Sequence, residues 1–243
     1  MPLATIKREA SRSKAQHGDS LRVAFQEIRE LIVHGRLAPG NWIVEADIAK
    51  KLGMSRTPVR SAIQLLQREG YVIGHRNGSK SRSMVAPLTR EDAAELYSII
   101  AAIEGLAGRQ TALLGKASRM EIATRLRDLN NQLRTISKEK SAHHISIFDL
   151  DREFHQIIVQ TGGGPRLLAL HRSIVPQAER YWRLYASSIM SYLHFSVAEH
   201  DAIIAAIASG HADRIECGLK TNWRNGSDRL AEVIKAFGER GSW

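Results

Sequence analysis

The segment over residues 45–60 restricts the fold more than any other part of the chain. It reads EADIAKKLGMSRTPVR, a short amphipathic stretch that runs to Gly53 and a second helical stretch that opens at Ser55 or Thr57. Gly53 supplies the turn, either hydroxyl residue can cap the second helix, and Pro58 falls in the first turn, where its missing N–H costs little. Two short helices joined by such a turn predict a helix-turn-helix.

The second of these helices, predicted over residues 56–69, has two distinct faces. Val59, Ile63 and Leu66 recur at helical spacing and form an apolar stripe for a core. A helix-turn-helix places the start of this helix in the major groove, where arginine bonds to guanine and hydroxyl groups donate to phosphates. A solvated face on a structural helix is the alternative. The side chains that we expect to contact DNA are Ser55, Arg56, Thr57, Arg60 and Gln64.

The flanking residues complete a compact N-terminal unit. Apolar residues at helical spacing predict a helix from Leu21 to the stop at Gly35. After the second helix, the apolar residues 71–73, the turn-like pair 77–78 and the return through 84–85 predict a β-hairpin. The hairpin is basic around its turn, as expected of a wing beside a reading helix. Its predicted DNA contacts are Arg76, Asn77, Gly78 and Lys80.

The remainder of the chain has the pattern of an all-helical domain. Pro87 and a Thr89 cap followed by Asp92 mark a boundary near residue 88. The predicted fold is mainly α, a winged helix-turn-helix followed by an all-α bundle of six or seven helices. The predicted divisions are a basic arm over 1–18, the DNA-binding domain over 19–87 and a ligand-sensing domain over 88–238. The predicted helices of that last domain are 90–114, 117–138, 146–160, 165–187, 189–209 and 211–238.

Charge favours a polyanionic partner. The chain of 243 residues has 35 Lys and Arg against 25 Asp and Glu, a formal charge of +10, which suits nucleic acid or anionic lipid. The first residues lack the apolar core of a secretory signal, and no apolar run approaches the ~20 residues of a membrane span. We therefore expect a cytoplasmic protein without a membrane partner. The single cysteine, Cys217, is interpreted as a small core residue.

A candidate metal site lies in the C-terminal part. Asp151 and His155 are four residues apart, so a helix would place the carboxylate and the imidazole on one face at metal-ligand spacing. His200 supplies a second imidazole that a folded bundle could bring opposite this pair. The alternative is that these side chains make ordinary surface or core hydrogen bonds, as most such pairs do.

The N-terminal unit resembles the winged-helix domain of GntR-family regulators. The resemblance covers residues 28–72 and is carried by Gly35, Leu37, Pro39-Gly40, Glu45, the run 52–60, Leu66 and Glu69-Gly70. It implies that Ser55, Arg56 and Arg60 occupy DNA-contacting positions of the family, as do the wing residues around 77–78. This chain has Ala46 where some relatives carry a contacting arginine, and its wing is longer and more basic than the usual turn.

Residues 88–235 resemble the FCD domain of the FadR-like GntR subfamily. The matching motifs include Ile103-Glu104, Asp151-x-x-Phe-His155, Glu199-His200 and Ser209-Gly210. The resemblance implies a divalent metal such as zinc, nickel or manganese, held by an Asp and three His in a cavity that also receives a small carboxylate effector. Asp151, His155 and His200 fall on three ligand positions, and Asn222 stands where the fourth ligand is His.

Two further departures concern the cavity. Ile100 stands at a frequent arginine position of the family, and Gly164 at a frequent asparagine position. An oxygen ligand from Asn222 is harder and weaker than imidazole, so the site is expected to hold metal less tightly. Loss of these polar groups predicts an unusual or less acidic effector.

Together these features predict a DNA-binding transcriptional regulator. We expect a homodimeric repressor on a pseudo-palindromic double-stranded operator, with a small-molecule effector bound in the C-terminal domain. Two alternatives compete with it. A metal-dependent hydrolase or lyase would use the Asp-His-His group to activate water, and a non-specific architectural protein would use the basic charge alone.

Overall fold

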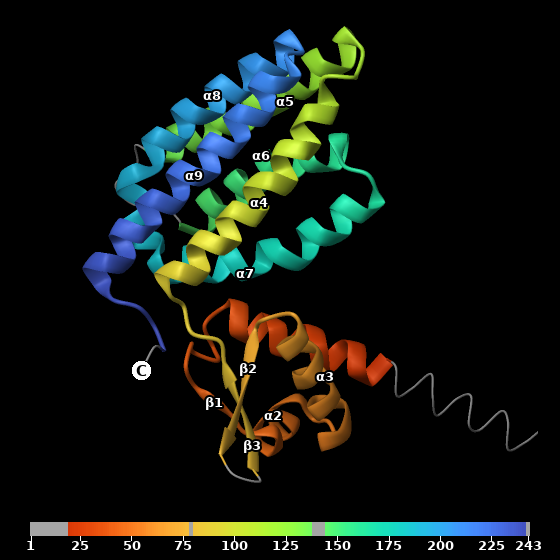
Figure 1. Cartoon of the computed structure of the whole chain (residues 1–243), viewed down its shortest axis with the longest axis vertical. Coiled ribbons are helices and arrows are strands. Elements are labelled where there is room, and N and C mark those ends of the chain that lie inside the picture. Colours follow the sequence, from red (N-terminus) through yellow and green to blue (C-terminus); the bar gives the residue numbers. More distant parts are fainter. Residues whose placement is uncertain (1–18, 78–79, 138–143, 242–243) are drawn as a thin grey trace, which may run out of the picture. The chain divides into compact units, whose positions relative to one another are not determined.

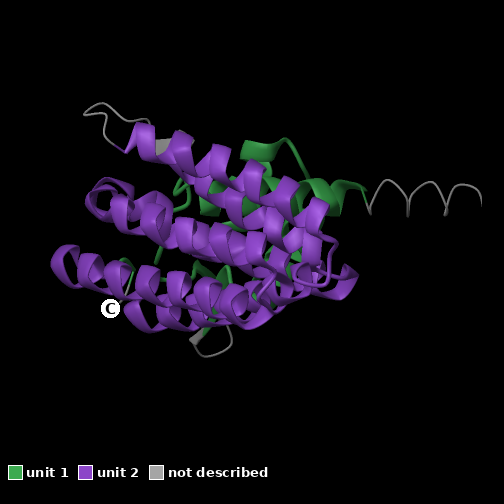
Figure 2. Ribbon diagram, turned by 90° about the horizontal axis from the view of Figure 1, so that it is seen from above, with its two compact units in different colours: residues 1–88, 240–243 green, residues 89–239 purple. Residues whose placement is uncertain are grey.

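The computed structural model describes residues 19–77, 80–137 and 144–241. The chain divides into two compact units, Met1–Leu88 with Arg240–Trp243, and Thr89–Glu239 (Figure 2). The basic arm over 1–18 and Gly78 of the wing lie outside the described residues.

The described residues of the N-terminal unit form three helices and a small antiparallel sheet (Figure 1). The strands follow the order β1-β3-β2, and in the hairpin Ile73 pairs with Met84 and Asn77 with Lys80. The hairpin and helices confirm the predicted winged helix-turn-helix. Strand β1 was not predicted, since two residues are too few for a periodic pattern. The elements are a helix over 19–33, β1 (Trp42–Ile43), α2 (Glu45–Leu52), α3 (Arg56–Arg68), β2 (Val72–Asn77) and β3 (Lys80–Val85).

The predicted apolar stripe holds this unit together. Ile28, Val59 and Leu66 have no exposed surface and pack with Tyr71 in one core. Helix α2 ends at Gly53, whose φ of 63° is left-handed and lets its N–H reach the last carbonyls of the helix. The turn therefore directs α3 so that its apolar face meets the core and its polar face meets solvent.

The C-terminal unit is helical throughout its described residues, as predicted (Figure 1). Its helix boundaries fall within a few residues of those predicted, except that η1 precedes α8, which begins at Leu193. Thr89 caps α4 by accepting a hydrogen bond from the Asp92 N–H at 3.2 Å. The elements are α4 (Arg90–Thr111), α5 (Lys116–Ile136), α6 (His144–Gly162), α7 (Pro165–Ile189), η1 (Met190–Tyr192), α8 (Leu193–Ser209) and α9 (Ala212–Phe237).

Helix α4 occupies the centre of this unit and packs against α6, α7 and α9 (Figure 1). It approaches α9 closely at Gly108, where an added Cβ would overlap Leu219 and Ile215. Because side chains from three neighbouring helices contact α4, residues that are distant in sequence come close together on its inward face. Glu104 lies on this face and has no exposed surface.

Cys217 is exposed, so its interpretation as a core residue is wrong. Ile215 and Leu219 are the buried positions on this part of α9, and Cys217 lies two residues from each, on the opposite face of the helix.

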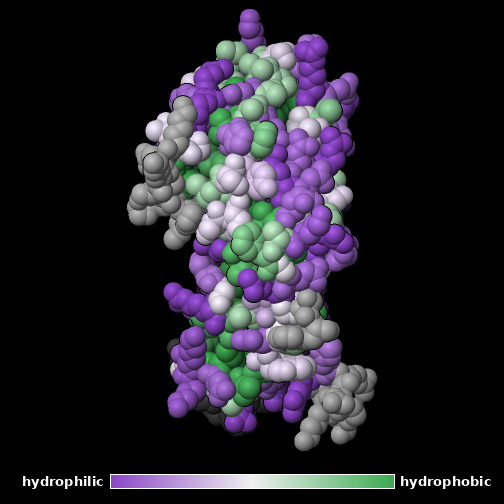
Figure 3. Space-filling model, turned by 90° about the vertical axis from the view of Figure 1, so that its left-hand side faces the viewer, coloured by the Kyte–Doolittle hydropathy of each residue, from purple (hydrophilic) through white to green (hydrophobic). Residues whose placement is uncertain are grey.

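Hydrophilic side chains cover much of the face in Figure 3, with hydrophobic patches among them. Within the described residues, no helix is long and apolar enough to cross a membrane.

Candidate functional sites

The start of α3 presents the predicted reading residues to solvent. Ser55 occupies the N-cap position, although its side chain makes no capping hydrogen bond. Arg56 and Arg60 lie one turn apart, and Gln64 follows one turn later on the same face. The five predicted side chains are all exposed, namely Ser55, Arg56, Thr57, Arg60 and Gln64.

The two arginines of α3 differ in their surroundings. Arg60 donates from Nε to both carboxylate oxygens of Glu45, at 2.9 and 3.1 Å, and its second nitrogen lies 2.9 Å from the same group. The hydrogen bond and then the charge of Glu45 raise the pKa of Arg60. Arg56 forms no ion pair with the described residues. Sequence reasoning missed the Glu45 contact because its partners are 15 positions apart.

The backbone of the hairpin gives the positions of the predicted wing residues. Arg76 and Asn77 lie in β2 and Lys80 lies in β3, where Asn77 pairs directly with Lys80. At the base of the sheet, half-exposed Trp42 contacts the His75 ring edge-on at 5.5 Å between centroids. The structure thus places three predicted wing residues at the facing strand ends.

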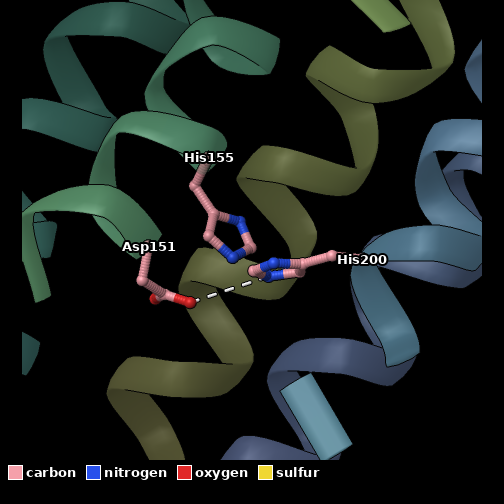
Figure 4. A group of neighbouring side chains, drawn as sticks. All are labelled: Asp151, His155 and His200. Carbon is pink, nitrogen blue, oxygen red and sulfur yellow. Dashed lines mark ion pairs between the residues drawn. The ribbon is translucent and has the colours of Figure 1, made fainter. Parts of the chain in front are cut away.

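The structure brings Asp151, His155 and His200 together inside the helical unit (Figure 4). Asp151 and His155 project from successive turns of α6, and His200 faces them from α8. One ligand atom from each side chain lies within 4.8 Å of the others. His200 Nε2 is 3.6 Å from an Asp151 oxygen. Burial raises the pKa of Asp151.

The hydrogen bonds of His200 determine its tautomer. Asn130 donates through Nδ2 to the Val197 carbonyl and to Asp201, so Oδ1 of Asn130 accepts from His200 Nδ1 at 3.2 Å. Burial, followed by the nearby charge of His155, lowers the pKa of His200 well below its usual value. His200 is therefore neutral, and its Nε2 is a bare lone pair, buried without a hydrogen-bond partner in the described part of the chain.

Glu104 links the histidine cluster to two further side chains. Its carboxylate accepts hydrogen bonds from His155 Nδ1 at 2.6 Å, His171 Nε2 at 2.9 Å and Trp223 Nε1 at 2.7 Å. Burial opposes its charge, but the two histidines outweigh burial and lower the pKa of Glu104 to about 2. For His155, burial is likewise outweighed by Glu104, which raises the pKa to about 9.

Sequence reasoning did not assign Glu104 or His171 to the site. These residues are 51 and 67 positions from their partners. No spacing rule reaches across such separations. A glutamate at an inward position of a helix was the one available signal, since a buried carboxylate requires partners.

Asn222 projects from α9 and is buried. Its Nδ2 donates to Glu199 at 2.7 Å, and Arg229 binds the same carboxylate through two nitrogens at 2.8 and 3.1 Å. This fixes the amide, so Oδ1 of Asn222 is the atom left for another partner. Asn222 also lines the cavity that Asp151 and His155 line.

That cavity has a volume of about 100 Å³ and lies within the helical unit. It is bounded by α4, α6, α7, α8, α9 and η1, and polar and aromatic side chains share its wall. The arrangement can hold a small molecule beside a cluster of nitrogen and oxygen ligands, in a largely desolvated setting.

Known families account for both units. The family described as "Bacterial regulatory proteins, gntR family" matches residues 21–79, and the FCD domain matches residues 95–224, more than half of the chain. The arrangement of a GntR helix-turn-helix followed by an FCD domain is that of FadR-like GntR proteins.

Several known proteins are similar to this chain. An HTH-type transcriptional regulator of Agrobacterium vitis is 35% identical over 105 residues, which are 43% of this chain and 60% of that protein. The gluconate operon transcriptional repressor of Bacillus licheniformis is 27% identical over 91% of this chain and 88% of its own length. The solved structure of a GntR regulator from Rhodococcus sp. RHA1 is 25% identical, with a TM-score of 0.63, and the match covers 90% of this chain and 99% of that one.

These relatives are transcriptional regulators and not enzymes, so the alternative of a hydrolase or lyase is not supported. The matches cover both units, and the winged helix and the helical domain occur in the family's order. The chain therefore belongs to the GntR family of bacterial regulatory proteins, with the FadR-like combination of winged helix and FCD domain.

Proposed function

We propose that this protein is a transcriptional repressor whose affinity for a DNA operator is changed by a small molecule bound in its FCD domain. The observation that carries the proposal is the exposed polar face of α3, with Arg56 and Arg60 one turn apart at the start of the helix. The family and the repressors among its relatives support it.

In this proposal the two arginines have different tasks. Arg56, which is unpaired among the described residues, supplies a charge free to bond a base edge or a phosphate. Arg60 contacts Glu45 through Nε and one terminal nitrogen, so its other terminal nitrogen is the one left to meet DNA. Ser55, Thr57 and Gln64 complete the α3 surface, and Arg76, Asn77, Gly78 and Lys80 position the wing on the backbone.

We propose further that the protein acts as a cytoplasmic homodimer on a pseudo-palindromic operator. Helix-turn-helix dimers bind two half-sites about 34–36 Å apart, so protein symmetry is mirrored in the DNA. A repressor must also meet chromosomal DNA, which places it in the cytoplasm.

The FCD cavity is proposed to hold a divalent cation such as zinc, nickel or manganese. The fit is supported by His200, whose buried Nε2 lone pair has no hydrogen bond from the described residues and faces Asp151 and His155. Asp151, His155 and His200 would be ligands, with Oδ1 of Asn222 as the weaker fourth. When bound, such a cation supplies a Lewis acid that attracts an oxygen of the effector.

The surrounding residues prepare these ligands. Glu104 accepts the Nδ1 proton of His155, so Nε2 of that ring is the nitrogen from which a bound cation would displace a proton. Asn130 accepts the Nδ1 proton of His200, which leaves the Nε2 lone pair of that ring for a ligand bond. Because the side chains come from α6, α8 and α9, a ligand that draws them together biases the packing of those helices.

The test is footprinting of genomic fragments selected by the purified protein. Two discrete protected half-sites support a regulator, and uniform protection would indicate an architectural DNA-binding protein. Arg56→Ala should weaken operator binding by about tenfold or more at physiological salt, because it removes a base or phosphate contact from each protomer. The matched control is Arg127→Ala, which removes one exposed charge from α5. Equal affinity of both variants for the operator would contradict the α3 assignment.

A further inference from the structure

The cavity beside the Asp151, His155 and His200 cluster has an aromatic wall. Four helices and η1 each contribute one aromatic ring to it. Two pairs of these rings are in contact: Tyr97 with Trp223 at 5.1 Å between centroids, and Phe148 with Trp182 at 5.2 Å. The aromatic lining residues are Tyr97, Phe148, Trp182, Tyr192 and Trp223. A wall of this kind recognises an apolar or aromatic body.

The charged side chains around the cavity are already engaged by the protein. Arg229 is bound to Glu199 through two nitrogens, and Arg152 is bound to Asp149 at 2.9 Å. The carboxylate of Glu104 accepts three hydrogen bonds. Both lining arginines therefore already have a carboxylate partner, which weakens the attraction of either for a second acidic group of a ligand.

The volume of about 100 Å³ sets the size of the ligand. An apolar cavity of roughly 150 Å³ is large enough to bind benzene in another protein. The present cavity is smaller than that one, so it admits at most a single ring and excludes a fused or branched molecule. The side of the cavity that Asp151 and His155 line leads toward the cluster, where the His200 Nε2 lone pair lies buried.

We propose that the effector is a monocyclic aromatic compound with a single oxygen-donor group, of the benzoate class. Its ring packs against Phe148 and Trp182, and its oxygen faces Asp151, His155 and His200. This inference rests on the proposed function, since it names the effector class of the same cavity.

A polyhydroxylated acid fits this cavity poorly. Each of its hydroxyl groups loses hydrogen bonds to water on entry, and the aromatic part of the wall returns none. An aromatic acid has one polar group to satisfy and gains ring contacts over the rest of its surface.

The experiment is calorimetric titration of the full-length, zinc-loaded protein with benzoate and, separately, with gluconate. Benzoate should bind about tenfold or more tightly than gluconate. Trp182→Ala should weaken benzoate by a similar factor while zinc content stays unchanged, because Trp182 lines the cavity outside the ligand cluster. Trp42→Ala is the matched control, since it removes a half-exposed indole from β1, outside the cavity.

A second variant guards against misfolding of the first. Val175→Thr keeps the side-chain shape and adds a hydroxyl to the cavity wall, so it should also weaken benzoate without loss of zinc. Equal or tighter binding of gluconate, no binding of benzoate, or benzoate affinity unaltered in both variants would overturn the proposed class. Operator footprints of the same preparations distinguish failure of the effector class from failure of the proposed function. Discrete half-sites support the proposed regulator whatever the effector, and uniform protection contradicts it.

Discussion

The carboxylate of Glu104 stays charged inside the helical unit because three donors surround it, two of them histidine nitrogens. A buried carboxylate with no partners would take up a proton, since desolvation disfavours the charged form. The same contact gives His155 a proton on Nδ1 and directs its other nitrogen toward Asp151 and His200. Glu104, for which no contact was predicted, thus determines the orientation of His155, a predicted metal ligand.

The pairing of Glu104 with His155 predicts a pH-dependent stability of the metal-free protein. The pKa of His155 is raised from 6.5 to about 9, so its contribution is fully present below pH 6.5 and is lost as pH rises through 9. The free energy of unfolding should fall by up to about 3 kcal/mol over that window. Urea unfolding of chelator-treated protein measures it. Glu104→Gln removes the partner charge and should flatten the slope, and an equal slope in both proteins would contradict the pairing.

Asn222 offers a test of the fourth ligand position. Its amide is tied to Glu199 through Nδ2, which leaves one neutral oxygen for another partner, and a neutral amide oxygen is a weak ligand for zinc. Asn222→His should tighten zinc binding about tenfold or more, since imidazole is a better zinc ligand. Competition with a chelating dye gives the affinity. His155→Ala should abolish stoichiometric zinc, and a wild type that stays metal-free after loading with zinc, nickel and manganese would end the metal proposal.

At the scale of elements, periodicity predicted most of the fold. The stripe of Val59, Ile63 and Leu66 defined α3, and Gly53 defined the turn before it, because both signals are local. Strand β1 exists only through its pairing with β3, a contact between distant positions that periodicity does not register. The Asp151, His155 and His200 cluster could be named by resemblance to the family. Glu104 and His171 could not be assigned to the site, because they contact their partners only when α4, α6 and α7 pack together.

The wing is the element whose role charge alone predicts. Neutralising Arg76, Lys80 and Arg82 together should weaken specific and non-specific DNA binding about equally, because phosphate contacts position a protein without reading bases. The dependence of affinity on salt should flatten by up to about three contacts per protomer. Binding to operator and to unrelated DNA across a salt series measures both effects. Loss of operator affinity alone, with the salt dependence unchanged, would mean that the wing reads bases.

At the scale of the whole molecule, regulation requires a free-energy coupling between two sites. The cluster joins α6 and α8, and Asn222 lies on α9, so a ligand held by all of these side chains would restrain helices distant in sequence. Such coupling is reciprocal by thermodynamic necessity: a ligand that changes operator affinity has its own affinity changed by the operator, by the same factor. A modest coupling is enough, since about 1.4 kcal/mol changes operator affinity tenfold.

Zinc provides the probe for this coupling. Operator affinity of the zinc-loaded and zinc-free proteins should differ by about tenfold, and operator DNA should change zinc affinity by the same factor and in the same sense. Fluorescence anisotropy of labelled operator gives the first quantity and dye competition the second. His155→Ala should remove the effect of zinc on operator affinity. The variant should still bind the operator, because His155 lies in the FCD domain and the DNA-reading helix α3 lies in the other unit. Equal operator affinity with and without zinc would show that the cluster is a structural site, and regulation would then depend on the cavity ligand alone.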